Sequence, residues 1–393
     1  MPIAPNLIPR FNSDYKLEDF FYAVRSVFKS NTDPGQLESI FGNRDYYFTN
    51  NGRSSLYVIL KSLDLPKGSK IGVPLYSCLV VLDAIIKAGH IPCFIDIDLN
   101  NYTLDVQDLG KKKDDLDAII VIHTFGRPAD MDEISKDAGD IPIIEDCAHS
   151  LLSDYKEKKT GTIGDLSFFS LAKYISAGGG GMIIVNNNKY SKRIKEELTF
   201  LETPTKRREI IHSLYIYIYS FLYHKPWFGA FAFQIGSSIE NKVDIASKRD
   251  FKVSRIRKSD FGVFIQKLEM LGKKVELQRK KSQKMLNELQ GVKITLPYEQ
   301  KDTLSNFYLF PILFDNKKDR DRAHELLRTM NVDTAKLYSM TPILAKQYYG
   351  YEGDCPNTEE FANRVLTIPN YYSLTMEELS TIISAVKKIG GYI

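Results

Sequence analysis

Residues 143–185 carry the pattern that decides the fold, and they read IIEDCAHSLLSDYKEKKTGTIGDLSFFSLAKYISAGGGGMIIV. Three short apolar runs, at 143–144, 166–171 and 181–185, have the length and composition of buried β-strands. Lys173 and the glycine run at 178–181 lie between the last two of these runs. The stretch therefore combines buried strands with residues that are able to carry chemistry.

The same alternation of elements extends over residues 69–187. Strand-like runs such as KIGVPLY, IPCFIDID and AIIVIHTF alternate with helical stretches such as SCLVVLDAIIKAG. This alternation predicts βαβ units and a mainly parallel sheet covered by helices. Ligands of such sheets bind outside the carboxyl ends of the strands. The candidate residues that follow the apolar runs are Tyr76, Asp96, His123, Asp146 and Ser170.

The pattern changes after about residue 258. A long helical stretch at 261–290 is followed by a strand-like run at 306–314 and by helical patterns at 319–330 and 377–389. We expect a large α/β domain over residues 1–258 and a smaller α+β domain over residues 259–393.

Composition and charge exclude several classes of protein. The chain has 393 residues, of which 43% are hydrophobic and 26% charged, and this excludes a disordered or fibrous protein. The net charge of +4 is too even for a nucleic-acid binder, so we expect the basic runs at 111–113, 206–208 and 279–281 to be solvated faces. The four cysteines form no CxxC pair, which argues against disulfides and a metal site, and a cytoplasmic location is expected.

Residues 210–236, which read IIHSLYIYIYSFLYHKPWFGAFAFQIG, complicate this simple picture. The stretch is apolar and aromatic, but it is too interrupted by polar residues for a membrane span. A helix at a bilayer surface, a buried helix and a dimer contact all remain possible explanations.

Lys173, Asp146 and Ser170 fit the needs of pyridoxal phosphate. This cofactor requires a lysine for its aldehyde, a carboxylate for its pyridine nitrogen and donors for its phosphate. A lysine between apolar runs is expected to be desolvated, which lowers its pKa and favours a Schiff base. A second phosphate cradle is predicted where Gly52, Arg53 and Ser54 open a helix.

Each of these residues also has an ordinary interpretation. Lys173 could be a surface lysine, Asp146 a strand-end cap and the glycine run a turn. The glycines match neither a nucleotide P-loop nor a dinucleotide-binding fingerprint. The function must therefore be inferred from the residues taken together.

Taken together, the motifs resemble those of the DegT/DnrJ/StrS family of PLP-dependent sugar aminotransferases, within fold-type I. The resemblance covers the chain from about residue 48 to its C-terminal end. The matching segments are NGRSSL at 51–56, VPLYS at 73–77, FIDID at 94–98, HTFGRPADMD at 123–132, EDCAH at 145–149 and CPNTEEFANRVLTIP at 355–369. The series Gly164-Asp165, Phe169-Ser170, Lys173 and Gly180-Gly181 completes the match.

The resemblance implies roles for individual residues. It makes Lys173 the Schiff-base lysine and Asp146 the partner of the pyridine nitrogen, and it places His149 beside the ring hydroxyl. His149 could equally be a hydrogen-bonded histidine in a half-buried loop. Tyr76 and Tyr338 would line the substrate pocket, although Tyr338 could be structural in a chain with 23 tyrosines.

Three positions depart from the family pattern. Ser170 precedes Lys173 by three residues where the family usually has five, so either Ser170 or Ser167 could hold the phosphate. Cys78 occupies the position of the aromatic residue that stacks on the cofactor ring. Arg255 matches an arginine that reaches the neighbouring subunit's phosphate, but the family's asparagine is Val253 here.

The implied reaction moves an amino group from an amino acid, glutamate in our expectation, to a nucleotide-linked keto-sugar. The resemblance also implies a homodimer and a role in polysaccharide or glycoconjugate biosynthesis. Two alternatives stay open at this point. A PLP-dependent sugar dehydratase would carry a histidine in place of Lys173, whereas a catalytically silent member could act as a binding protein held at a membrane by residues 210–236.

Overall fold

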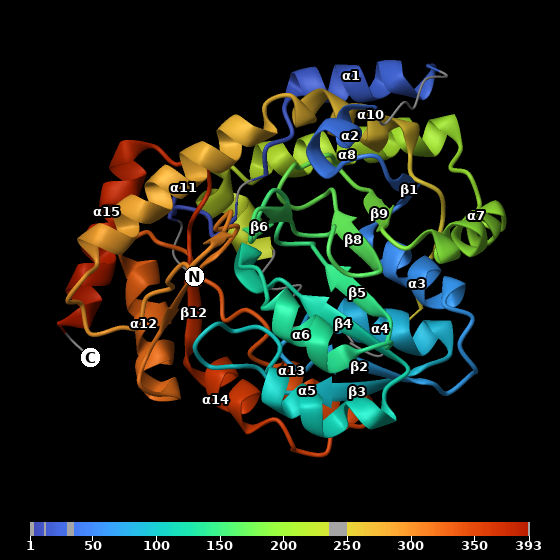
Figure 1. Cartoon of the computed structure of the whole chain (residues 1–393). Helices are drawn as coiled ribbons and strands as arrows, with labels where there is room; N and C mark the ends of the chain where they lie inside the picture. Colours follow the sequence, from blue (N-terminus) through green and yellow to red (C-terminus); the bar gives the residue numbers. More distant parts are fainter. Residues whose placement is uncertain (1–3, 12, 30–34, 236–249, 392–393) are drawn as a thin grey trace.

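A seven-stranded sheet forms the centre of the computed structural model, which describes residues 4–11, 13–29, 35–235 and 250–391 (Figure 1). In spatial order its strands are β1 (Asp45–Thr49), β9 (Gly181–Val185), β8 (Leu166–Ser170), β5 (Ile143–Asp146), β4 (Ala118–Ile122), β2 (Lys70–Pro74) and β3 (Ile91–Ile95). The strands from β8 to β3 pair in parallel, and only the pairs that include β9 are antiparallel. The predicted mainly parallel sheet is confirmed.

Both faces of the sheet are buried, because successive side chains of a strand point to opposite sides. Ile120 and Ile183 join the core on one side, whereas Ile119 and Ile184 pack on the other. The first side is covered by α3 (Gly52–Ser62), α4 (Leu79–Ala88) and α7 (Ser191–Thr199). The second side is covered by α1 (Leu17–Val27), α2 (Gly35–Phe41), α5 (Val106–Lys112), α6 (Met131–Ala138) and α10 (Lys258–Leu268).

A second hydrophobic core lies in the C-terminal part of the chain. Its elements surround a two-stranded sheet of β11 (Phe310–Leu313) and β12 (Val365–Ile368). The helices of this part are α11 (Leu271–Glu288), α12 (Lys317–Thr329), α13 (Thr341–Tyr348), α14 (Pro356–Arg364) and α15 (Met376–Gly390). A small sheet of β10 (Thr303–Leu304), β6 (Asp154–Tyr155) and β7 (Lys158–Lys159) pairs this part with the loop after β5.

The single helix expected over residues 261–290 is in fact two helices, α10 and α11. The reason lies in their packing. Phe261 and Phe264 of α10 belong to the core beside the central sheet, whereas Met285 of α11 belongs to the C-terminal core. The proposed division into residues 1–258 and 259–393 stays a prediction.

The apolar stretch at 210–236 begins within α8 (Lys206–Leu222) and continues through η4 (Phe228–Ala232), while residue 236 lies outside the described part. α8 lies beside α1 and α10 and is exposed along one side (Figure 1), whereas Phe228 and Phe233 further along the stretch are buried. Burial within its own chain therefore explains only part of the stretch. Among the described residues, none of the helices combines the length and the hydropathy needed to cross a membrane.

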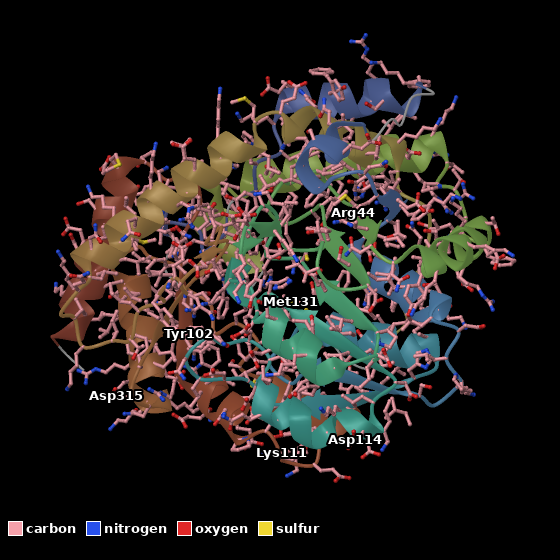
Figure 2. The ribbon with its side chains drawn as sticks, in the orientation of Figure 1. Arg44, Tyr102, Lys111, Asp114, Met131 and Asp315 are labelled. Atoms are coloured by element: carbon pink, nitrogen blue, oxygen red, sulfur yellow. The ribbon has the colours of Figure 1, made fainter. Side chains whose placement is uncertain are left out.

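The basic run at 111–113 is only partly a solvated face. Lys111 and Asp114 point outward at the rim of the molecule, whereas Tyr102 and Met131 are buried (Figure 2). Lys112, by contrast, is partly buried. Its Nζ donates to the Asp108 carboxylate at 2.9 Å and forms a second ion pair with Asp354.

Candidate active site

One cavity of about 240 Å³ lies at the carboxyl ends of β4, β5 and β8. Most of the predicted site residues line this cavity, and they are Gly52, Arg53, Tyr76, Cys78, Asp146, His149, Ser170, Lys173 and Tyr338. They come from segments that are distant in sequence, and the topology of the sheet brings them to one edge. Ser54 and Arg255 are not part of the cavity wall.

Asp146 is the last residue of β5 and is almost fully buried. Burial raises the pKa of its carboxyl group, while the positive charge of Lys173 and the N–H of Ala148, which donates to Oδ1 at 2.9 Å, oppose the rise. The net effect is a raised pKa. A buried carboxylate of this kind is stabilised by a cation in the cavity, such as a protonated pyridine nitrogen.

Lys173 lies in the tight turn that follows β8. Its backbone carbonyl accepts from the N–H of Ser176, and the glycine run begins two residues later. Gly178 and Gly180 have φ values of 92° and 96°, in a region that favours glycine. The glycines therefore let the chain turn back into β9 directly behind the lysine.

His149 is 6% exposed, and burial lowers its pKa well below the ordinary value, with a further contribution from the charge of Lys173. The imidazole is therefore neutral near pH 7. Its Nδ1 is buried and has no hydrogen-bond partner among the described residues. A buried polar atom without a partner is costly, so a bound group that supplies one would be stabilising.

The N-terminus of α3 forms the other end of the cavity. Asn51, the N-cap, accepts from the N–H of Ser54 at 2.9 Å, and the Ser54 hydroxyl is buried without a partner in the described part of the chain. The N–H groups and the dipole of such a helix start favour an anion. Gly52 packs close to Ser170, since a Cβ at Gly52 would lie 3.4 Å from the Ser170 Cβ.

The structure separates the two serines that could hold a phosphate. Ser170 ends β8 and faces the cavity, whereas the hydroxyl of Ser167 is fully buried and donates to the Gly161 carbonyl at 2.8 Å. Ser170 is therefore the serine in position to meet a ligand.

Arg53 holds its guanidinium over the ring of Phe251 at 4.0 Å and within 3.5 Å of the Asp83 carboxylate.

The remaining predicted residues are placed as follows. Tyr76 is 1% exposed, and its hydroxyl donates to the Leu337 carbonyl at 2.7 Å. Burial raises the pKa of Tyr338 well above its ordinary value, and its ring lies nearly parallel to that of His149, with centroids 6.4 Å apart. Arg255 is exposed on the surface.

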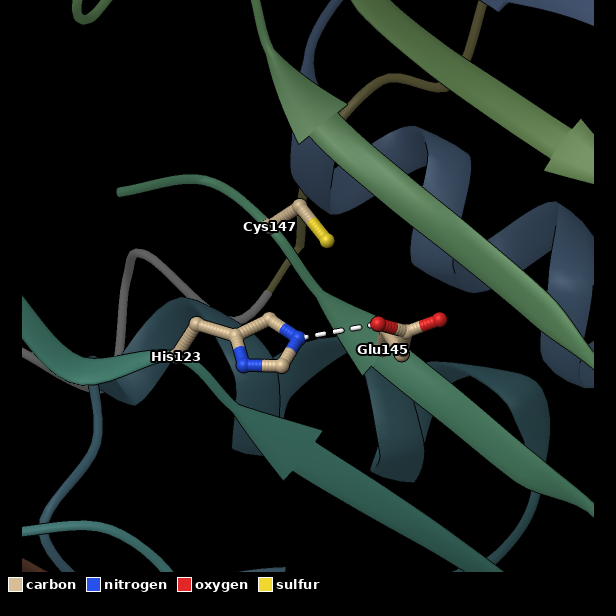
Figure 3. Close-up of side chains that lie close together, drawn as sticks. All are labelled: His123, Glu145 and Cys147. Atoms are coloured by element: carbon tan, nitrogen blue, oxygen red, sulfur yellow. Dashed lines mark hydrogen bonds and ion pairs between the residues drawn. The ribbon is translucent and has the colours of Figure 1, made fainter. Parts of the chain in front are cut away.

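A buried cluster of His123, Glu145 and Cys147 lies at the carboxyl ends of β4 and β5, on either side of Asp146 in the sequence (Figure 3). The His123 Nε2 lies 3.0 Å from Glu145, and its Nδ1 accepts from the N–H of Ala129 at 3.0 Å. Glu145 also accepts three backbone N–H bonds, from residues 161, 163 and 164. Because these bonds use both imidazole nitrogens and both carboxylate oxygens, the cluster is a hydrogen-bonded support for the end of β5 and a poor metal site.

Asn51, Ser77 and Thr124 also line the cavity, although they were not among the predicted site residues. Asn51 had a usable signal, since an asparagine directly before a helical pattern is a typical N-cap. The other two had no distinguishing pattern, because each simply follows a strand with the other residues of its loop.

Comparison with known proteins assigns the family. The sequence profile of the DegT/DnrJ/EryC1/StrS aminotransferase family matches residues 35–214 and 253–387, so the chain belongs to that family. A relative, dTDP-3-amino-3,6-dideoxy-alpha-D-galactopyranose transaminase from Aneurinibacillus thermoaerophilus, is 23% identical over 86% of this chain and 84% of its own. The uncharacterized protein MJ1066 from Methanocaldococcus jannaschii is 26% identical over 90% of this chain and 88% of its own.

Solved structures agree on the fold. The PLP form of the putative sugar aminotransferase Spr1654 from Streptococcus pneumoniae superposes with a TM-score of 0.79, at 17% identity, over 98% of this chain and 99% of the other. The architecture is therefore that of the sugar aminotransferases, as predicted.

Proposed function

We propose that this chain is a pyridoxal-phosphate-dependent aminotransferase that moves an amino group from an amino acid, glutamate, to a nucleotide-linked keto-sugar. The observation that carries the proposal is the shared cavity of Lys173, Asp146 and His149 at the start of α3. Membership of an aminotransferase family supports it, and so does the dTDP-sugar transaminase among its relatives.

The residues of the cavity fit the cofactor. The buried hydroxyls of Ser54 and Ser77 and the Nδ1 of His149 have no partner within the described residues, and all three lie in or beside the cavity. Asp146 has a raised pKa that a nearby cation would lower. When bound, pyridoxal phosphate supplies an electron sink that stabilises negative charge on the substrate carbon.

Each side chain has a defined task in this proposal. Lys173 would hold the cofactor through its aldehyde, and its amine would move a proton at the substrate carbon. Asp146 would keep the proton on the pyridine nitrogen. His149, which is neutral, donates or accepts a hydrogen bond at the ring hydroxyl through its unpartnered Nδ1.

The phosphate would be held by the α3 start together with the hydroxyls of Ser54 and Ser170. Arg255 is exposed, as a residue that reaches a neighbouring subunit must be. Cys78, Tyr76 and Tyr338 surround the remaining space, where the cofactor ring and the sugar would lie.

We also propose that the enzyme is a cytoplasmic homodimer, that it serves polysaccharide or glycoconjugate biosynthesis, and that residues 210–236 make a peripheral contact with a membrane. The homodimer and the biosynthetic role rest on the family resemblance, and the cytoplasmic location rests on the cysteine pattern. The membrane contact rests on the exposed position of α8.

The test is a spectroscopic titration of the reconstituted protein. Addition of glutamate should remove the cofactor's absorbance near the visible range, and a nucleotide-linked keto-sugar should restore it. Lys173→Ala should abolish this cycle. A protein that stays colourless after reconstitution would overturn the proposal and favour the silent binding protein.

A further inference from the structure

Three polar residues of α8, Glu209, Ser213 and Ser220, are turned inward. Glu209 and Ser220 are 3% and 1% exposed. The Ser220 hydroxyl donates to the Ser13 carbonyl at 2.6 Å and accepts from the N–H of Tyr15 at 3.1 Å. The Glu209 carboxylate accepts from the N–H of Ser259 at 3.0 Å. These hydrogen bonds, together with the packing of Ile216 and Tyr217 against the core beside the central sheet, fix which side of the helix faces the protein.

The outward side of α8 is consequently apolar. Its members are Ile211, Leu214, Tyr215, Ile218, Tyr219 and Phe221, which are 44–62% exposed. Their spacing, with repeats of three and four residues, places them on one side of the helix. Trp227, Phe231 and Ile235 extend this surface beyond the helix, with exposures of 40–60%. These nine residues are called the apolar face below.

The charges near the apolar face are mostly positive, although Lys225 pairs with Glu378 of α15 at 2.5 Å. Lys206, Arg207 and Arg208 are exposed in the first turn of α8, and the Lys206 Nζ lies 5.2 Å from the ring of Phe28, the residue after α1. The adjacent Glu209 is buried, and residues 210–235 contain no aspartate or glutamate. A partner with negative charge at its surface is complementary to this arrangement.

The family profile does not describe most of this surface. It matches up to residue 214 and resumes at residue 253, so the second half of α8 and all of η4 lie outside the matched residues. These segments form most of the apolar face.

The apolar face borders a second cavity next to the active site. This cavity, of about 250 Å³, is lined by Phe11, Lys173, Tyr219, Tyr223 and Tyr308 among others. Tyr219 belongs to both the cavity wall and the apolar face, and its ring stacks against that of Tyr223 with centroids 5.4 Å apart. Whatever covers the apolar face therefore lies at the mouth of a cavity that reaches Lys173.

We propose that the apolar face docks on an anionic lipid bilayer, with the mouth of this second cavity at the bilayer surface. The inference rests on the proposed peripheral contact of residues 210–236, and it specifies the surface, the charge of the lipid and the orientation of the active site. Aromatic and aliphatic side chains beside a basic cluster are typical of helices that lie in the bilayer interface. A second copy of the chain is the competing occupant.

Trp227 provides a direct readout, because it is the only tryptophan of the chain and it lies on the apolar face. Vesicles of phosphatidylcholine that contain about 30% phosphatidylglycerol should shift the Trp227 emission to shorter wavelength, and brominated lipid should quench it.

 Vesicles of phosphatidylcholine alone should do neither at the same lipid concentration. Raising the salt concentration should weaken the effect, because it screens the basic cluster.

Charge reversal at the surface supplies the matched comparison. Arg207→Glu with Arg208→Glu should weaken binding to the anionic vesicles by about tenfold or more, measured by co-sedimentation. Lys317→Glu with Lys318→Glu, which reverses two exposed lysines on α12, should leave binding unchanged. Circular dichroism and the cofactor's absorbance, recorded on the same samples, show that each variant is folded and loaded.

Two results would overturn the docking proposal. The first is wild-type protein that neither sediments with anionic vesicles nor changes its Trp227 emission. The second is an emission shift that depends on protein concentration in the absence of lipid. If Ile218→Ser abolishes this shift and also lowers the molecular mass of the protein measured by light scattering, the face is a contact between two copies of the chain. Either result leaves the proposed transamination standing if the cofactor's absorbance still responds to glutamate.

Discussion

Asp146 and Lys173 line the same cavity, and the charge of Lys173 opposes the rise that burial causes in the pKa of Asp146. The two residues come from different strand ends, β5 and the turn after β8. A carboxylate and an amine held in one half-enclosed cavity are the two groups that must act on opposite parts of a pyridoxal ring. Their relationship is the physical basis of the proposed function.

The role of Asp146 predicts the effect of Asp146→Asn. The amide has a similar shape but cannot carry the negative charge that keeps a pyridine nitrogen protonated. We expect kcat to fall on the order of 10²-fold or more, while Lys173 still binds the cofactor. Steady-state kinetics combined with cofactor absorbance measure both effects. Unchanged kcat in a fully loaded variant would contradict the assigned role.

Gly181→Ala tests the link between the glycine run and the start of α3. A Cβ at Gly181 would lie 2.4 Å from the Asn51 carbonyl oxygen and from the Ser55 hydroxyl. The start of α3 must then shift, so we expect weaker cofactor binding and a loss of about 1–3 kcal/mol in the free energy of unfolding.

The matched control is Gly272→Ala in α11, where an added Cβ meets no atom of the described residues within 4 Å. This change should leave cofactor affinity unaltered and should not lower stability, because alanine favours a helix. Equal behaviour of the two variants in cofactor titrations and thermal melts would show that the close contact at Gly181 is unimportant.

The buried carboxyl group of Asp260 should make the free energy of unfolding depend on pH. Burial raises the pKa of its carboxyl group to about 7, although Arg257 lies at 3.1 Å, and the other groups that face it are Glu209, His212 and Ser259. Because the folded-state pKa exceeds the unfolded value of about 4, the folded protein binds the extra proton. The contribution of this residue to stability is present below pH 4 and is lost as the pH rises toward 7.

The comparison that isolates this effect is Asp260→Asn. Relative to the variant, the free energy of unfolding of the wild type should fall by on the order of 3–4 kcal/mol between pH 4 and pH 7. Urea titrations at several pH values measure the difference. A difference that stays constant over this range would mean that Asp260 is ionised throughout in the folded protein.

Glu145 tests whether the cluster of His123, Glu145 and Cys147 is structural. Glu145→Gln replaces an acceptor-only carboxylate with an amide that must turn its NH₂ group toward a donor, and the side chain is fully buried. We expect a loss of more than about 2 kcal/mol in the free energy of unfolding. Added zinc should leave the melting temperature of the wild type unchanged, and a rise in the melting temperature would instead identify a metal site.

The sequence predicted the parts of the site that local patterns determine. Asp146, Ser170 and Lys173 follow buried apolar runs, and strand ends of a parallel sheet meet at one edge, so their convergence could be expected. Gly52 and Arg53 were predicted from the start of a helical pattern. These positions depend on short stretches of chain whose period and composition are visible in the sequence.

Contacts between distant segments could not be predicted in this way. The orientation of α8 depends on the hydrogen bonds of Ser220 with Ser13 and Tyr15, and nothing in the local pattern identifies these partners. The break between α10 and α11 was missed for a similar reason, because two separate cores attract the two halves.

Reduction with borohydride tests the central claim most directly. The protein loaded with pyridoxal phosphate is reduced, digested and mapped by mass spectrometry, with Lys173→Ala treated in parallel. The account predicts one pyridoxyl-modified peptide, which contains Lys173, and no such peptide from the variant. An unmodified Lys173 in a protein that has bound the cofactor, or a label on another lysine, would contradict it.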